Sequence, residues 1–171
     1  MSSFLTSYLK RIAYYKLLGE QTFAQLDELD FHYQPNEESN SIAIIIQHIA
    51  GNMLSRFTDF LNSDGEKEWR NRDTEFEEKH LSKEELMALW QKGWNCYLTA
   101  VQSLTGNDLE KTITIRSEQL TVTDALNRQL AHYPYHVGQI VYLGRLIKNK
   151  TWKNLSIPKG QSQQFNDQMK K

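Results

Sequence analysis

Residues 123–148, TDALNRQLAHYPYHVGQIVYLGRLIK, decide the fold class, because apolar side chains recur along them at spacings close to three and four. Asp124 is an acidic residue of the kind that stabilises the first turn of a helix. The stretch therefore predicts a long amphipathic helix. Its apolar stripe consists of Leu126, Leu130, Tyr133, Val137, Ile140, Val141 and Leu143.

The same stretch carries His132 and His136, which lie one helical turn apart. Both rings would project from one face of the helix, an arrangement with which helices chelate a single divalent ion. Pro134 lies between them and allows a second interpretation, in which the helix begins at Pro134 and His132 lies outside it. Because Leu126 and Leu130 continue the apolar stripe upstream, we favour one kinked helix.

Three further segments show helical periodicity, at about residues 3–29, 40–62 and 82–104. Asn40 or Ser41 can cap the second of them, and Ser82 with Glu85 forms a capping-box pattern at the start of the third. Eight glycines and three prolines in 171 residues are too few for a loop-rich fold. The sequence therefore predicts an all-α protein built as a four-helix bundle.

A polar connection of about 20 residues, NSDGEKEWRNRDTEFEEKHL, separates the second and third helical segments. An extended chain of this length can span the roughly 30 Å of a 20-residue helix, so these two helices can run parallel. Such a bundle differs from a simple up-and-down arrangement. Because long structureless connections are uncommon, we expect this linker to be functional.

Residues 111–126, KTITIRSEQLTVTDAL, alternate apolar and polar side chains around the turn-like sequence RSEQ. This pattern predicts a short β-hairpin before the last helix. The tail at about residues 150–171 is polar and is predicted to be irregular. No internal repeat or low-complexity tract interrupts the sequence, which predicts one domain over residues 1–171.

The composition limits the classes of partner. A formal net charge of −1 gives no electrostatic reason to bind nucleic acid or an anionic membrane. No stretch approaches the roughly 20 apolar residues that span a bilayer, and the N-terminus has no signal-peptide pattern. The single cysteine, Cys96, excludes an intrachain disulfide and fits a reducing compartment. We therefore expect a cytoplasmic protein without nucleic-acid or membrane partners.

A third histidine, His48, lies in the second helical segment within QHIAGN and can supply a nitrogen from a facing helix. Three neutral imidazoles would leave one tetrahedral position open for water or substrate, as in reactive zinc sites. A single helical histidine is more often a packing residue than a ligand, so the metal centre rests on His48, His132 and His136 together. His32 and His80 are interpreted as surface residues.

Four residues are candidates to bind substrate. Asn52 and Arg56 follow His48 at four-residue steps and share its helix face. Asn52 could orient a ligand or a bound water, and Arg56 could hold an anionic group, although a solvated polar face explains Arg56 more simply. Tyr135 and Gln139 flank the histidine pair and are expected to line the pocket.

Motifs of several other chemistries are absent, including the dinucleotide fingerprint, the P-loop, the nucleophile elbow and the Cys-x-x-Cys pair. HExxH is absent too, so no glutamate is built in beside the histidines as a general base. The Glu-x-x-His motif of di-iron bundles is replaced at Gln129 and Tyr133. A mononuclear centre with three nitrogen ligands remains.

QHIAGN at 47–52, TVTDAL at 121–126 and AHYPYHVGQIVYL at 131–143 together resemble the DinB-like superfamily of metal-binding four-helix bundles. GNMLSRFTDFLNSDGEKEWRNRD and the terminal SIPKG are similar to one of its uncharacterised bacterial subfamilies. The resemblance covers nearly the whole chain. Pro134 between two ligands departs from the pattern.

The resemblance implies an up-down-down-up bundle, a nickel or zinc ion on the three histidines, and a homodimer. It further implies a thiol-dependent S-transferase that joins a small-molecule thiol, such as bacillithiol, to a small electrophile. Two alternatives remain open. One is a hydrolase that uses a metal-bound water, and the other is a non-catalytic metal-binding or stress-related protein.

Overall fold

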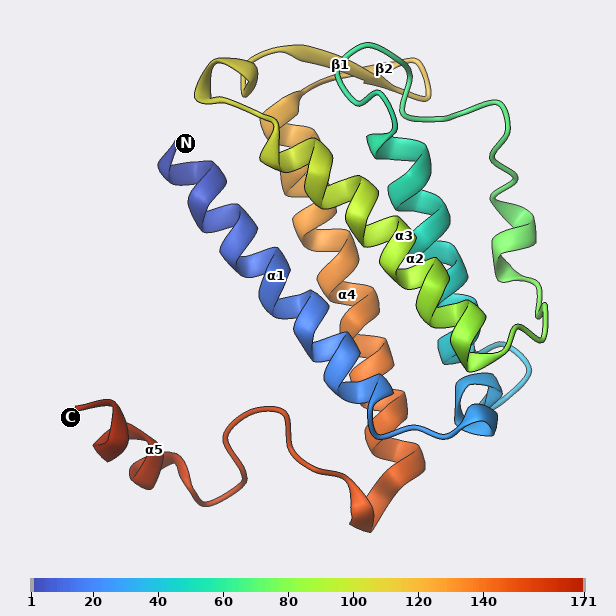
Figure 1. Cartoon of the computed structure of the whole chain (residues 1–171), viewed down its shortest axis with the longest axis vertical. Helices are drawn as coiled ribbons and strands as arrows, with labels where there is room; N and C mark the ends of the chain where they lie inside the picture. The colour runs from blue at the N-terminus through green and yellow to red at the C-terminus, as the bar shows by residue number, and fades with distance from the viewer. Residues whose placement is uncertain (1, 171) are drawn as a thin grey trace.

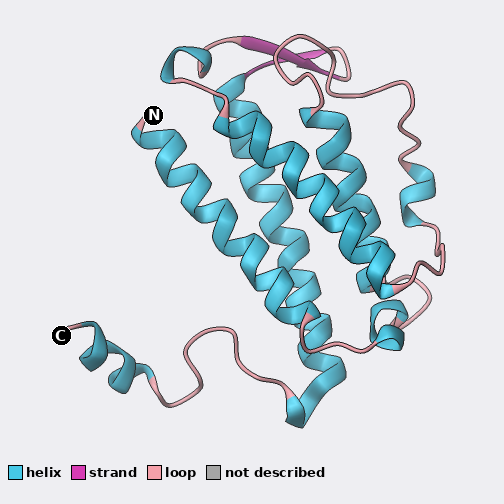
Figure 2. Ribbon diagram, viewed as in Figure 1, coloured by secondary structure: helices cyan, strands magenta, loops and turns pink. Residues whose placement is uncertain are grey.

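The computed structural model describes residues 2–170, which are mostly helical with one two-stranded sheet (Figure 1; Figure 2). The predicted helical class and the short hairpin before the last long helix are confirmed. None of the helices in this described part is long and apolar enough to cross a membrane. The elements are α1 Ser3–Phe23, α2 Ile42–Phe57, α3 Lys83–Gln102, β1 Thr112–Ile115, β2 Glu118–Thr121, α4 Val122–Lys148 and α5 Ser162–Met169.

The four long helices lie side by side in two pairs that run in opposite directions (Figure 1). α1 packs mainly on α4, and α2 packs mainly on α3. The linker between α2 and α3 returns along the outside of α2, and its short 3-10 turn Asp73–Phe76 packs on that helix. The length of the linker therefore lets α2 and α3 run parallel.

Each long helix begins at a side chain that accepts a backbone N–H from the first turn. Ser2, Ser41 and Thr121 have this role at α1, α2 and α4. Ser82 and Glu85 form the predicted capping box at the start of α3. These caps fix where the helices enter the core.

Two helices end earlier than the apolar periodicity indicates. α2 ends at Phe57 rather than near residue 62, since Thr58 is extended and Asp59 has a φ of 51°. α1 ends at Phe23 rather than near residue 29, and Glu28–His32 forms a separate 3-10 turn. Apolar residues beyond both ends remain buried, which explains why the pattern continues past the helices.

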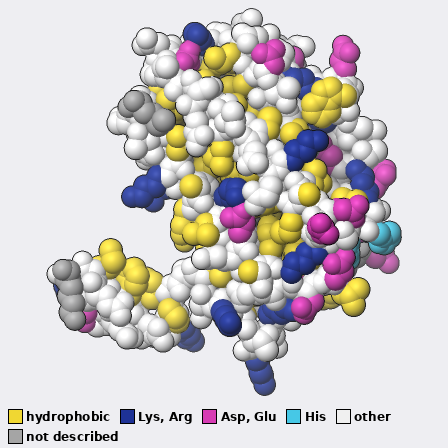
Figure 3. Space-filling view, in the orientation of Figure 1, with side chains coloured by type: hydrophobic (Ala, Val, Ile, Leu, Met, Phe, Trp, Pro, Cys, Tyr) yellow, Lys and Arg dark blue, Asp and Glu magenta, His cyan; other side chains and the backbone are white. Residues whose placement is uncertain are grey.

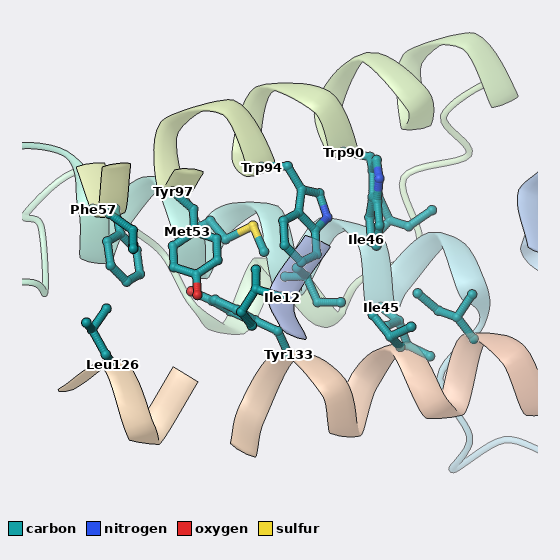
Figure 4. Packing of buried hydrophobic residues seen from close by; sticks show 14 of the residues in the cluster. Ile12, Ile45, Ile46, Met53, Phe57, Trp90, Trp94, Tyr97, Leu126 and Tyr133 are labelled. Atoms are coloured by element: carbon teal, nitrogen blue, oxygen red, sulfur yellow. The ribbon is translucent and has the colours of Figure 1, made fainter. Parts of the chain in front are cut away.

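Aromatic residues of α3 fill the centre of the core (Figure 4). Trp90 and Trp94 are almost fully buried, and the Trp94 ring lies 6.1 Å from the ring of Tyr133 on α4, centroid to centroid. At Gly93 a Cβ atom would lie 2.9 Å from the Cα atom of Ala50. Glycine therefore permits the close approach that fixes α2, the helix carrying His48.

The hairpin ties the linker to the start of α4. Arg116 and Ser117, which connect β1 to β2, both have positive φ, as in a two-residue type I′ turn. Asp64 of the linker accepts their N–H groups at 2.9 and 3.0 Å. The neighbouring Gly65 N–H donates to Thr114 O at 2.8 Å. The first part of the linker is thus fixed before it reaches the outside of α2.

Pro134 lies inside α4, which runs unbroken from Val122 to Lys148. The interpretation in which the helix begins at Pro134 is therefore wrong, and both paired histidines belong to one helix.

The tail is less irregular than predicted, because it contains α5. All residues of α5 are exposed, so no buried stripe marked it in the sequence. Figure 1 shows the tail extending away from the other helices.

Candidate metal centre

Three histidine rings meet between α2 and α4. His132 Nε2 lies 3.3 Å from His48 Nε2 and 3.1 Å from His136 Nε2. His48 and His136 are buried, and His132 is half-buried. Nitrogens bound tetrahedrally to zinc at about 2.0–2.1 Å lie about 3.3–3.4 Å apart, so this spacing fits one shared cation. The three histidines could therefore hold a metal ion.

Glu75 of the linker sets the orientation of His48. Its Oε2 atom lies 3.0 Å from His48 Nδ1, and Arg70 donates to the same carboxylate from Nε at 2.7 Å and Nη2 at 2.9 Å. Burial opposes ionisation of Glu75, but the hydrogen bonds from His48 and Arg70 outweigh it and lower the pKa of the carboxyl group. The ionised carboxylate accepts a hydrogen bond from the Nδ1–H group of His48. In the neutral ring the other nitrogen, Nε2, then carries no proton and offers its lone pair.

Gln139 has the corresponding role for His136. Its Oε1 atom lies 2.8 Å from His136 Nδ1 and can only accept a hydrogen bond there. In the neutral ring, the Nε2 atom of His136 therefore also offers a lone pair, on the side that faces the other rings. Gln139 was expected to line the pocket; it contacts His136 Nδ1 and is not among the residues that line the cavity beside His48 and His132.

Two of the three rings, those of His132 and His136, favour the neutral form, which is the form that can bind a metal. Burial lowers the pKa of His132 to about 3, with contributions from His136 and His48. Burial also lowers the pKa of His136, although its hydrogen bond to Gln139 opposes the shift. Three imidazole nitrogens that converge at these distances match the donor set of zinc and nickel sites.

A cavity of about 250 Å³ opens beside His48 and His132, and we call it the arginine cavity. Asn52 and Gln129 contribute to its wall, and Asn52 accepts a hydrogen bond from Tyr133 Oη at 3.0 Å. The remaining lining residues are Arg56, Arg70, Arg72, Arg116 and Arg128.

Arg56 is buried rather than lying on a solvated polar face. It donates to Gly65 O at 2.5 Å and to Glu66 Oε2 at 2.9 Å, which holds the linker to α2. The structure thus brings Asn52 and Arg56 together beside His48, as their four-residue spacing indicated.

Tyr135 lies elsewhere. It is 63% exposed, and its ring packs edge-on beside His136 with centroids 5.0 Å apart. Together with Gln139 it lines a second cavity on the outer side of α4. The structure therefore does not bring Tyr135 into the arginine cavity.

His32 and His80 are less isolated than expected, because Glu78 joins them. His32 Nδ1 lies 3.1 Å from Glu78 Oε1, which also accepts the backbone N–H of His80 at 2.9 Å. Glu78 further accepts from the Ser41 hydroxyl at 3.3 Å. The cluster fastens the end of the linker to the start of α2.

Glu75 and the arginines of the linker were not among the residues expected from the sequence. The unusual length of the linker was the signal that pointed to them. The linker also brings a carboxylate to the histidines although HExxH is absent. Glu75 contacts Nδ1 of His48, however, and not the side on which the three Nε2 atoms converge.

Comparison with protein families gives a match over nearly the whole chain. The model of a family described as "Protein of unknown function (DUF1572)" matches residues 1–161, which include α1 to α4 and the three histidines. Comparisons with curated proteins and with solved structures give no significant match.

Proposed function

This chain belongs to the family of proteins of unknown function DUF1572, and we propose that it is a metal-dependent S-transferase. In this proposal His48, His132 and His136 bind one zinc or nickel ion. A small-molecule thiol of the bacillithiol type is the nucleophile, and a small electrophile is its acceptor.

The observation that carries the proposal is the convergence of three Nε2 atoms, with the Nδ1 atoms of two rings occupied by Glu75 and Gln139. Structural zinc sites use four protein ligands, whereas three ligands leave a position for a substrate. Imidazole ligands suit both zinc and nickel. The donor set therefore supports a reactive centre.

The arrangement of the helices supports assignment of the family to the DinB-like superfamily. α1 and α4 run in one direction and α2 and α3 in the other (Figure 1). We propose that this is the up-down-down-up bundle of that superfamily, with the linker as its long crossover.

His48, His132 and His136 would hold the ion, which would lower the pKa of a bound thiol and so supply a thiolate at neutral pH. His132 would bind the ion through Nε2 and would not accept the thiol proton, which would pass to solvent. Glu75 and Gln139 would hold the rings of His48 and His136 in the orientation in which their Nε2 atoms converge. In this proposal the thiolate sulfur would bond to the electrophilic carbon, and the leaving group would depart with the electron pair of the bond that breaks.

The contacts of Glu75 favour thiol transfer over hydrolysis. A hydrolase needs a base at the open side of the centre, but Glu75 is held by His48 Nδ1 and by two hydrogen bonds from Arg70. The carboxylate therefore serves to orient a ligand.

We further propose a homodimer in the cytoplasm. Tyr135, Tyr142 and Leu146 share one side of α4 and are 63%, 68% and 46% exposed. This apolar surface is suited to pairing with a second copy of the chain.

Thiol conjugation by protein loaded with zinc or nickel tests the activity. The assay compares bacillithiol and glutathione against a panel of alkylating electrophiles, with His48→Ala as the matched inactive variant. We expect thiol-dependent turnover by the wild type alone. Turnover without thiol would favour hydrolysis, and no turnover above His48→Ala across the panel would remove the transferase function.

A further inference from the structure

The carboxylates near the arginine cavity are already committed to ion pairs. Glu66 Oε2 accepts from Arg56 Nη1 and from Arg116 Nε, each at 2.9 Å. Glu75 accepts two hydrogen bonds from Arg70. No acidic residue of the described chain lines the cavity itself. Two carboxylates thus serve three of the five arginines.

The other two arginines have weak partners. Arg72 lies 4.0 Å from Asp73, whose side chain is 96% exposed, and Arg128 lies 3.7 Å from Glu118, whose side chain is 64% exposed. Exposed pairs of this kind contribute little binding energy. The guanidinium groups of Arg72 and Arg128 therefore remain available to a ligand.

A buried donor in the cavity wall also lacks a partner. The Arg70 side chain is 2% exposed, and its Nη1 atom makes no hydrogen bond to any described residue. Glu66 Oε2 lies 3.6 Å from this atom, beyond hydrogen-bond distance. Leaving a buried charged donor unpaired is costly, so this atom indicates a missing acceptor.

The positive charge is local. The chain as a whole has a formal net charge of −1, and on the face shown in Figure 3 acidic and basic side chains are intermingled. Five arginines among nine lining residues are therefore a property of this cavity and not of a generally basic surface.

Phe76 connects the cavity to the metal centre. The Arg72 guanidinium lies over the Phe76 ring, 4.9 Å from its centroid. The His48 ring packs on the same Phe76 ring, and the two rings have centroids 4.7 Å apart and planes inclined by 32°. A cation–π contact of this kind orients the guanidinium. Arg72 and His48 thus contact the same ring, so a ligand bound by Arg72 would lie near His48.

We propose that the substrate of this centre carries a carboxylate or phosphate group, which Arg70, Arg72 and Arg128 bind in the arginine cavity. The inference rests on the proposed function, because the reacting end of the same molecule would face His48 and His132, which also line the cavity. Guanidinium groups bind these planar or tetrahedral oxyanions through paired hydrogen bonds. A volume of about 250 Å³ limits the ligand to a small molecule.

Calorimetric titration with inorganic phosphate and with malonate tests the inference on metal-free and zinc-loaded protein. Arg72→Gln, Arg128→Gln and the double variant are suitable because both side chains are about half exposed. Arg11→Gln, an exposed arginine on α1, is the matched control. Circular dichroism verifies that each variant is folded.

We expect saturable binding to the wild type and to Arg11→Gln, and at least about tenfold weaker binding to the double variant. The stronger of the two probes identifies the group as phosphate or carboxylate. The inference is overturned if the wild type binds neither probe. It is equally overturned if the double variant binds as the control does, since the anion would then be held without Arg72 and Arg128.

Zinc stoichiometry measured on the same samples separates the two proposals. Zinc without arginine-dependent anion binding refutes only the anionic substrate. Arginine-dependent anion binding without zinc refutes the metal-dependent function and leaves an anion site.

Discussion

His48 Nδ1 lies 3.0 Å from Glu75 Oε2, so the orientation of His48 on α2 depends on a carboxylate of the linker. Arg70 holds that carboxylate through two hydrogen bonds and is itself buried. Partners of this kind set the tautomer of a histidine and raise its basicity as a ligand. Glu75 would therefore act on a bound metal through His48.

Replacing Glu75 by Gln tests this role. The amide keeps the shape but loses the charge that pairs with Arg70 and stabilises the His48 Nδ1–H. We expect zinc affinity to fall about 10–100-fold, measured by competition with a chromophoric chelator. Glu77→Gln, two residues away and exposed, is the control and should bind zinc as the wild type does. Equal affinities in the two variants would show that Glu75 does not orient the ligand.

At the scale of elements, the linker packs against α2 at a glycine. A Cβ atom on Gly51 would lie 2.8 Å from the carboxyl carbon of Glu75. Glycine at this position thus lets the linker come close enough to bring Glu75 to His48, one helical turn away on the same helix.

Gly51→Ala is expected to displace Glu75 and weaken zinc binding without unfolding the chain. Alanine favours the helix by about 1 kcal/mol over glycine, so the loss of affinity should occur in a protein with unchanged helix content. Gly138→Ala on α4 is the control, because no atom lies within 4 Å of its added Cβ. Titration with zinc measures the affinity, and circular dichroism measures the helix content. If Gly51→Ala binds zinc as tightly as Gly138→Ala does, the close approach has no role in the centre.

The starts of the helices could be predicted from local sequence patterns, whereas the contacts of the linker could not. Ser82 and Glu85 lie three residues apart, so their capping box is visible in the sequence. Glu75 lies 27 residues from His48, and only the folded path of the linker brings them together. Tyr135 is adjacent to His136, and about 100° per residue around a helix turns its side chain to another face. Tyr135 is thus next to His136 in the sequence, but its side chain does not line the arginine cavity.

At the scale of the whole molecule, the histidines join the two helix pairs. α2 packs mainly on α3, and α4 packs mainly on α1, whereas His48 meets His132 and His136 across the two pairs. A metal bound to all three would link the halves of the core. Binding to the folded state alone also stabilises that state by mass action.

The metal-free protein is expected to lose stability as the pH falls from about 6.5 towards 3. His132 has a pKa of about 3 in the folded chain and about 6.5 when unfolded, so in this range the unfolded chain binds a proton that the folded chain does not. Above about pH 6.5 both states are neutral and the contribution to pH dependence vanishes. Urea unfolding in the presence of a chelator, at pH 7 and at pH 5, measures this loss of stability. His132→Gln should show a smaller loss of stability, and an equal loss would contradict the low pKa.

Elemental analysis of protein purified without a histidine tag and loaded with zinc or nickel tests the shared centre most directly. We predict about one tightly bound metal ion per chain in the wild type and in His80→Ala, and none in a folded His132→Ala variant. A wild type that retains no metal, or a His132→Ala variant that retains as much as the wild type, would contradict the centre formed by His48, His132 and His136.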